Sequence, residues 1–217
     1  MEHSPGTRVT VTVHAPARAF APGVQTALMR LGYNLITPRT AEELGEGAAA
    51  LQPAIRIVDD RELDQVPLET GPEALPIVLL VGHRGPVVSD ARAVGTVRRR
   101  AKLNPVYEVL QRALEHHPRS VPRAETTLPV RALRGERAWA GAIRSLSEKG
   151  CLVQGARGLE PDLRVDLCFP IPGTGLLTVP AQASDVRPDG RTTLIFRDAC
   201  QETRKTIAGY VVDQLAG

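Results

Sequence analysis

The pattern of apolar residues changes near residue 117, and this change limits the folds open to the chain. Before it, stretches with an apolar residue at every second position alternate with stretches whose apolar residues recur every three or four positions. After it, short alternating stretches follow one another until a final helical pattern. We therefore predict two domains, residues 1–117 and 118–217, the first α/β and the second mainly β.

In the first half, an apolar run at residues 76–81 is typical of a strand buried on both faces of a parallel sheet. Further strands are predicted at residues 8–14, 34–37, 54–58 and 93–97. Helices are predicted at residues 24–31, 40–51 and 104–114, with Thr40 and Asn104 as the capping residues of the last two. Strands that alternate with helices predict a flavodoxin-like, doubly wound parallel sheet.

The second half has the strand spacing of a small antiparallel barrel. Five or six strands are predicted, from segments at residues 128–133, 137–145, 150–154, 164–169, 175–185 and 191–196. A last helix at 201–215 has Ile207, Val211 and Leu215 on one side. We expect this apolar side to cover an open face of the barrel.

Composition favours a cytoplasmic protein without membrane insertion. No apolar run approaches the roughly 18 residues needed to span a bilayer, and the first residues lack the pattern of a signal peptide. Cys151, Cys168 and Cys200 are odd in number and widely spaced, so we expect buried thiols rather than disulfides or a metal site. The 27 basic and 24 acidic residues nearly balance, but the arginines cluster locally, which favours a small anionic ligand or a partner surface.

Two arginines and a following strand have the composition of an anion site. Arg119 and Arg123 are four positions apart, and Ser145 and Ser147 occupy alternate positions of one predicted strand, followed by Gly150. A guanidinium offers parallel N–H donors to phosphate oxygens and a flat face for stacking on a base. These residues therefore predict an anion site.

This arrangement resembles the PilZ family of bacterial cyclic di-GMP receptors, whose signature is R-x-x-x-R followed by [D/N]-x-S-x-x-G. The resemblance extends over residues 118–217. It implies that Arg119 and Arg123 clamp phosphate and guanine from an arm at residues 118–124, that Ser147 hydrogen-bonds the ligand, and that Gly150 lets the backbone approach it. Ser145 stands where the family has Asp or Asn, and losing that contact to guanine would cost about 1–3 kcal/mol.

The first half is similar in element order and size to the receiver domain of response regulators. That resemblance places Asp59 at the phosphoacceptor position. However, residues 13–16 lack the second acidic cluster that holds Mg²⁺, residues 81–83 lack the hydroxyl residue, and Lys102 is poorly placed as the expected lysine. We therefore predict a pseudo-receiver that is not phosphorylated, with Asp59 and Asp60 in a solvated turn rather than a metal site.

Each candidate residue also has a simpler interpretation. Arg119 and Arg123 could be solvated linker residues, since long cations on linkers are usually exposed. Ser145 and Ser147 could make only local hydrogen bonds, as strand hydroxyls often do. Trp139 is expected to pack at its hairpin rather than stack on a ligand.

These observations favour a signalling effector. It would bind cyclic di-GMP through the second domain and relay the bound state to an unidentified signalling or motility protein through the first. The alternative is a degenerate PilZ-like adaptor that binds no nucleotide and acts by protein contacts in motility, polarity or polysaccharide control. DNA binding is not expected because no helix-turn-helix pattern appears. No cofactor, resident metal or catalytic group is expected either.

Overall fold

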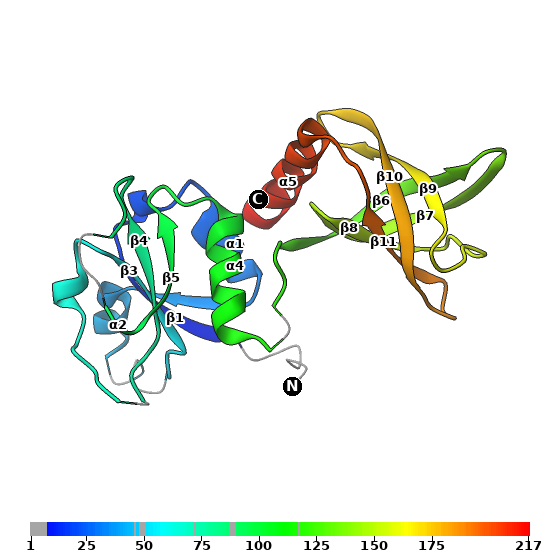
Figure 1. Cartoon of the computed structure of the whole chain (residues 1–217). Coiled ribbons are helices and arrows are strands. Elements are labelled where there is room, and N and C mark those ends of the chain that lie inside the picture. Colours follow the sequence, from blue (N-terminus) through cyan, green and yellow to red (C-terminus); the bar gives the residue numbers. More distant parts are fainter. Residues whose placement is uncertain (1–7, 46, 48–50, 72, 87–89, 117) are drawn as a thin grey trace. The chain divides into compact units, whose positions relative to one another are not determined.

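The computed structural model describes residues 8–45, 47, 51–71, 73–86, 90–116 and 118–217. The chain forms two compact units, one ending at Ser120 and the other beginning at Val121 (Figure 1). The first is an α/β unit and the second is a β-barrel unit. No helix within the described ranges is long and apolar enough to cross a bilayer.

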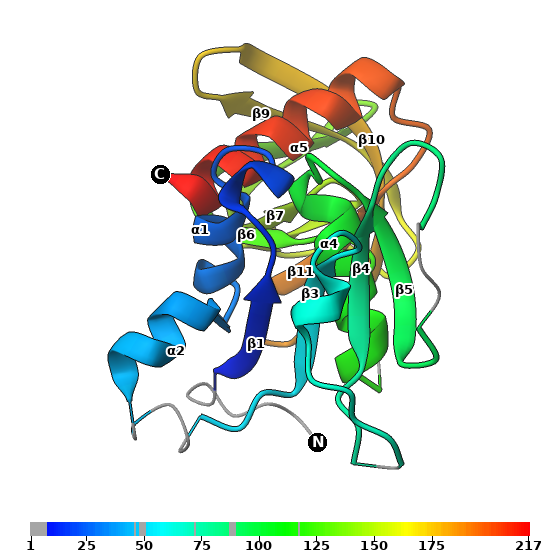
Figure 2. The ribbon, with the colours of Figure 1, turned by 90° about the vertical axis from the view of Figure 1, so that its left-hand side faces the viewer.

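The α/β unit is built on a five-stranded sheet in which neighbouring strands are parallel. The strand order is β2-β1-β3-β4-β5, the order of a flavodoxin-like sheet, and Figure 2 shows β1, β3, β4 and β5 side by side. Every residue of β3 and β4 is buried, which the apolar run at 76–81 predicted for β4. The strands are β1 (Val9–His14), β2 (Tyr33–Ile36), β3 (Ile55–Asp59), β4 (Ile77–Val81) and β5 (Ala93–Arg98).

Within the described ranges, α-helices lie on both sides of this sheet. Figure 1 shows α1 (Val24–Arg30) and α4 (Leu103–Leu114) on one side and α2 (Pro38–Leu44) on the other. Two short 3₁₀ helices, η1 (Ala17–Ala19) and η2 (Leu63–Gln65), follow β1 and β3. Among the described residues, no α-helix joins β3 to β4 or β4 to β5, so the chain crosses there through η2 and loops.

The predicted helix starts were wrong in two places. Helix α2 begins at Pro38, and Thr37 caps it by accepting a hydrogen bond from the Thr40 backbone N–H at 3.1 Å. Proline fits the first position of a helix because it lacks the amide hydrogen that would have no partner there. The helix then ends before Gly45, which has a positive φ of 52°; positions 46 and 48–50 of the predicted longer helix lie outside the described residues. Helix α4 begins at Leu103, so Asn104 is not its cap.

The β-barrel unit confirms the predicted antiparallel barrel. Its strand order around the closed barrel is β10-β11-β8-β7-β6-β9. The strands are β6 (Arg123–Arg134), β7 (Arg137–Ser147), β8 (Gly150–Gln154), β9 (Arg164–Ile171), β10 (Gly175–Val186) and β11 (Arg191–Phe196). Strand β6 starts five residues earlier than predicted, so Arg123 lies in the barrel rather than on a free arm.

The final helix, α5 (Gln201–Ala216), packs as its sequence predicted. Ile207, Val211 and Leu215 are all buried. The Tyr210 hydroxyl hydrogen-bonds the Thr126 hydroxyl of β6 at 2.7 Å, which fixes the helix to the barrel wall. Cys200 is exposed at the start of this helix and its Sγ accepts a hydrogen bond from the Thr203 N–H, so the prediction of a buried thiol was wrong there.

Candidate functional site

Strand register brings three of the predicted site residues together at one end of the barrel. Arg123 of β6 pairs directly with Ser147 of β7, and Ser147 pairs with Gly150 of β8. Residues directly opposite each other in antiparallel strands lie on the same face of the sheet. Arg123, Ser147 and Gly150 therefore form one row across three strands, although 27 positions separate the first from the last in the sequence.

Ser145 lies two positions before Ser147 on β7, with the Leu146 pair between them. It lies opposite Glu125 of β6 and Leu152 of β8. The register shifts between Ile143 and Ser145, which makes Arg144 an extra residue on β7 relative to β8. Bulges of this kind redirect side chains and are frequent beside binding sites.

The bulged Arg144 lines a groove that sequence reasoning did not assign. The groove has a volume of about 510 Å³ and is also lined by Glu125, Thr126 and Thr127. Arg144 donates hydrogen bonds from Nε to the Gln154 Oε1 at 3.1 Å and from Nη1 to the Thr127 Oγ1 at 3.4 Å. The shift in register at Arg144 is what marks this residue as part of a site. That shift can be recognised only once the strands are paired.

Arg119 precedes the barrel and is exposed. Its backbone N–H donates to the Gln111 Oε1 of α4 at 3.2 Å. The structure thus fixes the backbone at this position and leaves the guanidinium at the surface.

Ser147 is fully buried, with 0% of its surface exposed. Its hydroxyl donates to the Gly150 carbonyl oxygen at 3.0 Å, across the turn that joins β7 to β8. A hydroxyl has one hydrogen to donate and can still accept, so Ser147 retains only an acceptor role toward any further group.

Gly150 is required by the packing of the barrel. A Cβ added there would lie 2.3 Å from the Leu194 carbonyl oxygen of β11. That distance is far below van der Waals contact with a backbone atom that cannot rotate away. The close backbone approach expected at Gly150 is thus made by a neighbouring strand of the chain itself.

We expect Gly150→Ala to lower the free energy of unfolding by about 1–3 kcal/mol, since β8 and β11 must separate to admit the methyl group. Urea denaturation measures this loss. Gly209→Ala is the matched control: an added Cβ meets nothing within 4 Å on α5, so the substitution is expected to raise stability by roughly 0.5–1 kcal/mol. Equal stability of Gly150→Ala and the parent would contradict the described strand contact.

Cys151 follows Gly150 on β8 and is fully buried. Burial raises the pKa of this thiol to about 12, and the nearby Arg123 charge opposes that rise only in part. The thiol therefore stays protonated at neutral pH. Cys151 contributes to the apolar interior behind the site and not to its chemistry.

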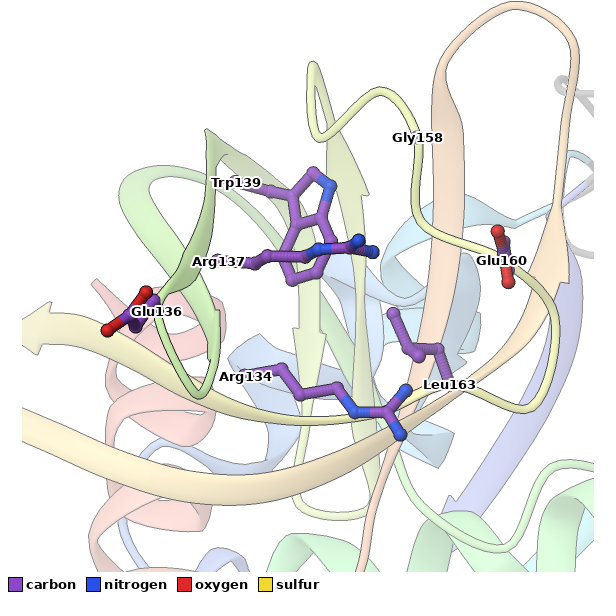
Figure 3. A pocket seen from close by; sticks show the side chains of 7 residues that line it. All are labelled: Arg134, Glu136, Arg137, Trp139, Gly158, Glu160 and Leu163. Carbon is purple, nitrogen blue, oxygen red and sulfur yellow. The ribbon is translucent and has the colours of Figure 1, made fainter.

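A second hollow on the barrel lies at the other end of β6. Its volume is about 530 Å³, and it is lined by residues of the β6–β7 hairpin and of the loop between β8 and β9. Figure 3 shows Arg134, Arg137 and Leu163 directed toward one space, with the Trp139 indole beside it and Glu136 turned away. Trp139 is half-buried, and its Nε1 lies 3.6 Å from where a Cβ on Gly158 would be, so it packs against that loop.

In the α/β unit, the prediction for Asp59 and Asp60 as a solvated turn was wrong. Both are only 3% exposed. Arg99, immediately after β5, donates from Nε to Asp59 Oδ2 at 2.9 Å and from Nη2 to Asp59 Oδ1 at 2.8 Å, and it also pairs with Asp60. Burial of two adjacent carboxylates requires such a cation. Within the described ranges, no group of three or more His, Cys, Asp or Glu residues is placed to hold a metal.

The second unit is a small β-barrel domain, with six antiparallel strands and a C-terminal helix. Residues 116–213 match the family model of the PilZ domain. The chain therefore contains a PilZ domain in its second half. No curated protein matches the sequence.

Several solved structures resemble part of this chain. The Bacillus subtilis inhibitor of motility (MotI/DgrA) is 17% identical over 45% of this chain and 51% of that chain, with a TM-score of 0.40. The PilZ domain of Escherichia coli YcgR with c-di-GMP is 12% identical over 46% of this chain and 92% of that chain, with a TM-score of 0.38. The K. pneumonia MrkH–c-di-GMP complex is 14% identical over 45% and 51%, with a TM-score of 0.39. The match thus spans about half the length of MotI/DgrA and of MrkH.

Proposed function

We propose that the barrel is a receptor for cyclic di-GMP, and that Arg119, Arg123, Ser145, Ser147 and Gly150 form its binding site. The observation that carries this proposal is the row of Arg123, Ser147 and Gly150 on three neighbouring strands, because a sequence motif with a binding role must converge in space. The PilZ domain match over residues 116–213 supports it.

The chemistry of the row suits a ligand that carries two phosphates and two guanines. The Arg123 guanidinium can form paired hydrogen bonds to a phosphate and can stack on a base. Ser147 already donates its hydroxyl hydrogen to Gly150, so it would accept a hydrogen bond from a guanine N–H. Because Ser147 is covered in this structure, binding requires a rearrangement of the segments around it.

Titration calorimetry of the full chain with cyclic di-GMP tests the proposal. Saturable binding with a Kd below about 100 μM, equivalent to roughly 5.5 kcal/mol of binding free energy, supports a receptor. The absence of heat at that concentration favours an adaptor that binds no nucleotide.

The alternative is an adaptor that binds no nucleotide. It is favoured by the packing roles of Ser147 and Gly150, which hold the β7–β8 turn and the β8–β11 contact through atoms of the chain itself. Their packing roles would keep Ser147 and Gly150 in a barrel that no longer has a ligand-binding function. Such an adaptor would act by protein contacts in motility, polarity or polysaccharide control.

Ser145 gives the proposal a second test. We expect Ser145→Asn to tighten cyclic di-GMP binding by roughly tenfold, because an amide can both donate to and accept from a guanine edge. Ser145→Asp should gain less, since the new carboxylate faces Glu125 directly across the strand pair. Ser184→Asn, at an exposed position of β10, is the control. Unchanged or weaker affinity in Ser145→Asn would show that position 145 does not limit binding.

We also propose that the α/β unit relays the bound state to an unidentified signalling or motility protein, without phosphorylation of Asp59. The pairing of Asp59 with Arg99 supports the second part, because this carboxylate is already held by a cation of the chain. DNA remains outside the predicted partners. MrkH, one of the similar structures, is described as a c-di-GMP-dependent transcription regulatory factor.

A further inference from the structure

Arginines gather at the carboxyl edge of the parallel sheet. They come from the last residue of β5 and from the segments that follow β1, β3 and β5, and they line two hollows of about 350 and 340 Å³. Both hollows are lined by Arg61, Arg99 and Arg100; Arg98 lines only the first and Arg18 only the second. In open α/β sheets, ligands bind in the crevice outside the carboxyl ends of the strands.

Arg99 differs from the other arginines at this edge because other residues of the unit hold it in place. Its guanidinium is held by Asp59 and Asp60, and its backbone N–H donates to the Val81 carbonyl at 2.8 Å. A Cβ on Gly82 would lie 3.0 Å from Arg99 Nη1, so the glycine leaves space for this side chain. Arg99 and the two aspartates thus form a fixed base beneath the hollows.

Arg100 has a left-handed backbone, with φ of 58°. Its neighbours on both sides fix this conformation: Arg99 bonds to Val81, and the Ala101 N–H donates to the Ala19 carbonyl at 3.2 Å. Glycine adopts such a conformation without steric cost, whereas for an arginine the conformation is sterically unfavourable. Observed strain of this kind, next to a hollow, is a reason to look for a function of the side chain.

The cations around the hollows outnumber the anions. Arg18, Arg61, Arg98 and Arg100 are exposed, and no hydrogen bond or ion pair of their side chains is found within the described ranges. The lining carboxylates are Asp59, already bound to Arg99, and Glu62. The hollows therefore have an excess of positive charge, with planar donors available to an anion.

We propose that this edge binds a small molecule that carries a phosphate or diphosphate group. The two hollows adjoin at Arg61 and Arg100, which gives room for two linked anionic groups or for one anion and the rest of a ligand. A phosphate offers three oxygens and close to two negative charges to several guanidinium groups, whereas a single carboxylate can engage only one or two. The combined size suits a small ligand.

This inference is independent of the cyclic di-GMP proposal, because it concerns other residues in the other unit. The probe is inorganic pyrophosphate, titrated into the full chain by calorimetry at constant ionic strength. We expect saturable binding to the parent chain. Arg100→Gly should weaken it by roughly tenfold or more through loss of a charge-assisted contact, while its melting temperature stays equal or rises because the backbone strain is relieved.

Three further measurements decide the result. Arg61→Ala should weaken pyrophosphate binding by a similar factor, whereas Arg39→Ala, an exposed arginine on α2, should leave it unchanged. Arg123→Ala should also leave it unchanged, which separates this site from the barrel. The proposal is overturned if the parent chain does not bind pyrophosphate, if Arg100→Gly and Arg61→Ala bind it like the parent, or if glutamate binds as tightly as pyrophosphate.

Discussion

The variant Arg123→Ala is expected to lose cyclic di-GMP binding, with a Kd raised roughly a hundredfold or more above that of the parent chain. Two parallel hydrogen bonds from a guanidinium to a phosphate are each worth about 1.5–3 kcal/mol, and alanine can form neither. Arg123 is also the one charged member of the row that includes Ser147 and Gly150. Titration calorimetry of both chains measures the change.

The control for this experiment lies on the same strand. Arg131 of β6 is exposed and pairs with Cys168 of β9, so it belongs to a different part of the barrel wall. Arg131→Ala removes the same side chain from the same element and is expected to bind cyclic di-GMP like the parent. Equal affinities of Arg123→Ala and the parent would refute the proposed phosphate contact.

The second large effect is expected for stability. Arg99→Ala should lower the free energy of unfolding by about 3–5 kcal/mol, because it leaves the buried carboxylates of Asp59 and Asp60 without their cation. Denaturation in urea, followed by circular dichroism, measures the loss. Arg39→Ala removes one partner of an exposed pair with Glu43 on α2 and should cost about 0.5 kcal/mol or less.

A second variant distinguishes loss of the ion pair from loss of packing. Asp59→Asn in the Arg99→Ala background removes one of the two buried charges that Arg99 had paired with, so it should recover part of the lost stability. Asp59→Asn alone should be destabilising, since it weakens the pair with Arg99. If Arg99→Ala cost less than about 1 kcal/mol, the two carboxylates would have to be well hydrated, contrary to their burial.

Local patterns in the sequence predict much of the fold. The all-apolar run at residues 76–81 correctly indicates a buried central strand, and Ile207, Val211 and Leu215 correctly indicate the buried face of α5. Both features depend on periodicity within a single element. The start of α2 was missed because the Thr37–Pro38 step, rather than the later Thr40, has the combination of cap and first helical residue.

The candidate site depends on long-range pairing, which the local pattern does not contain. Spacing alone suggests that Ser147 and Gly150 serve a ligand, whereas the register of β7, β8 and β11 reveals packing roles for both. Arg99 lies about forty positions beyond Asp59, and nothing in either segment indicates that they meet. A buried acidic pair is recognisable only when the strands that bring its cation are in place.

The Arg99 pairing also determines what can reach this edge of the sheet. A cation supplied by the chain has a fixed stoichiometry, so the charge balance around Asp59 does not vary with the supply of divalent ions. An exchangeable ion would make the unit responsive to chelators and to competition between metals. In this unit, the species whose concentration can vary is instead the proposed anion, which binds outside the pair of Arg99 with Asp59 and Asp60. Chelation of metal ions by EDTA should therefore leave the unit unchanged.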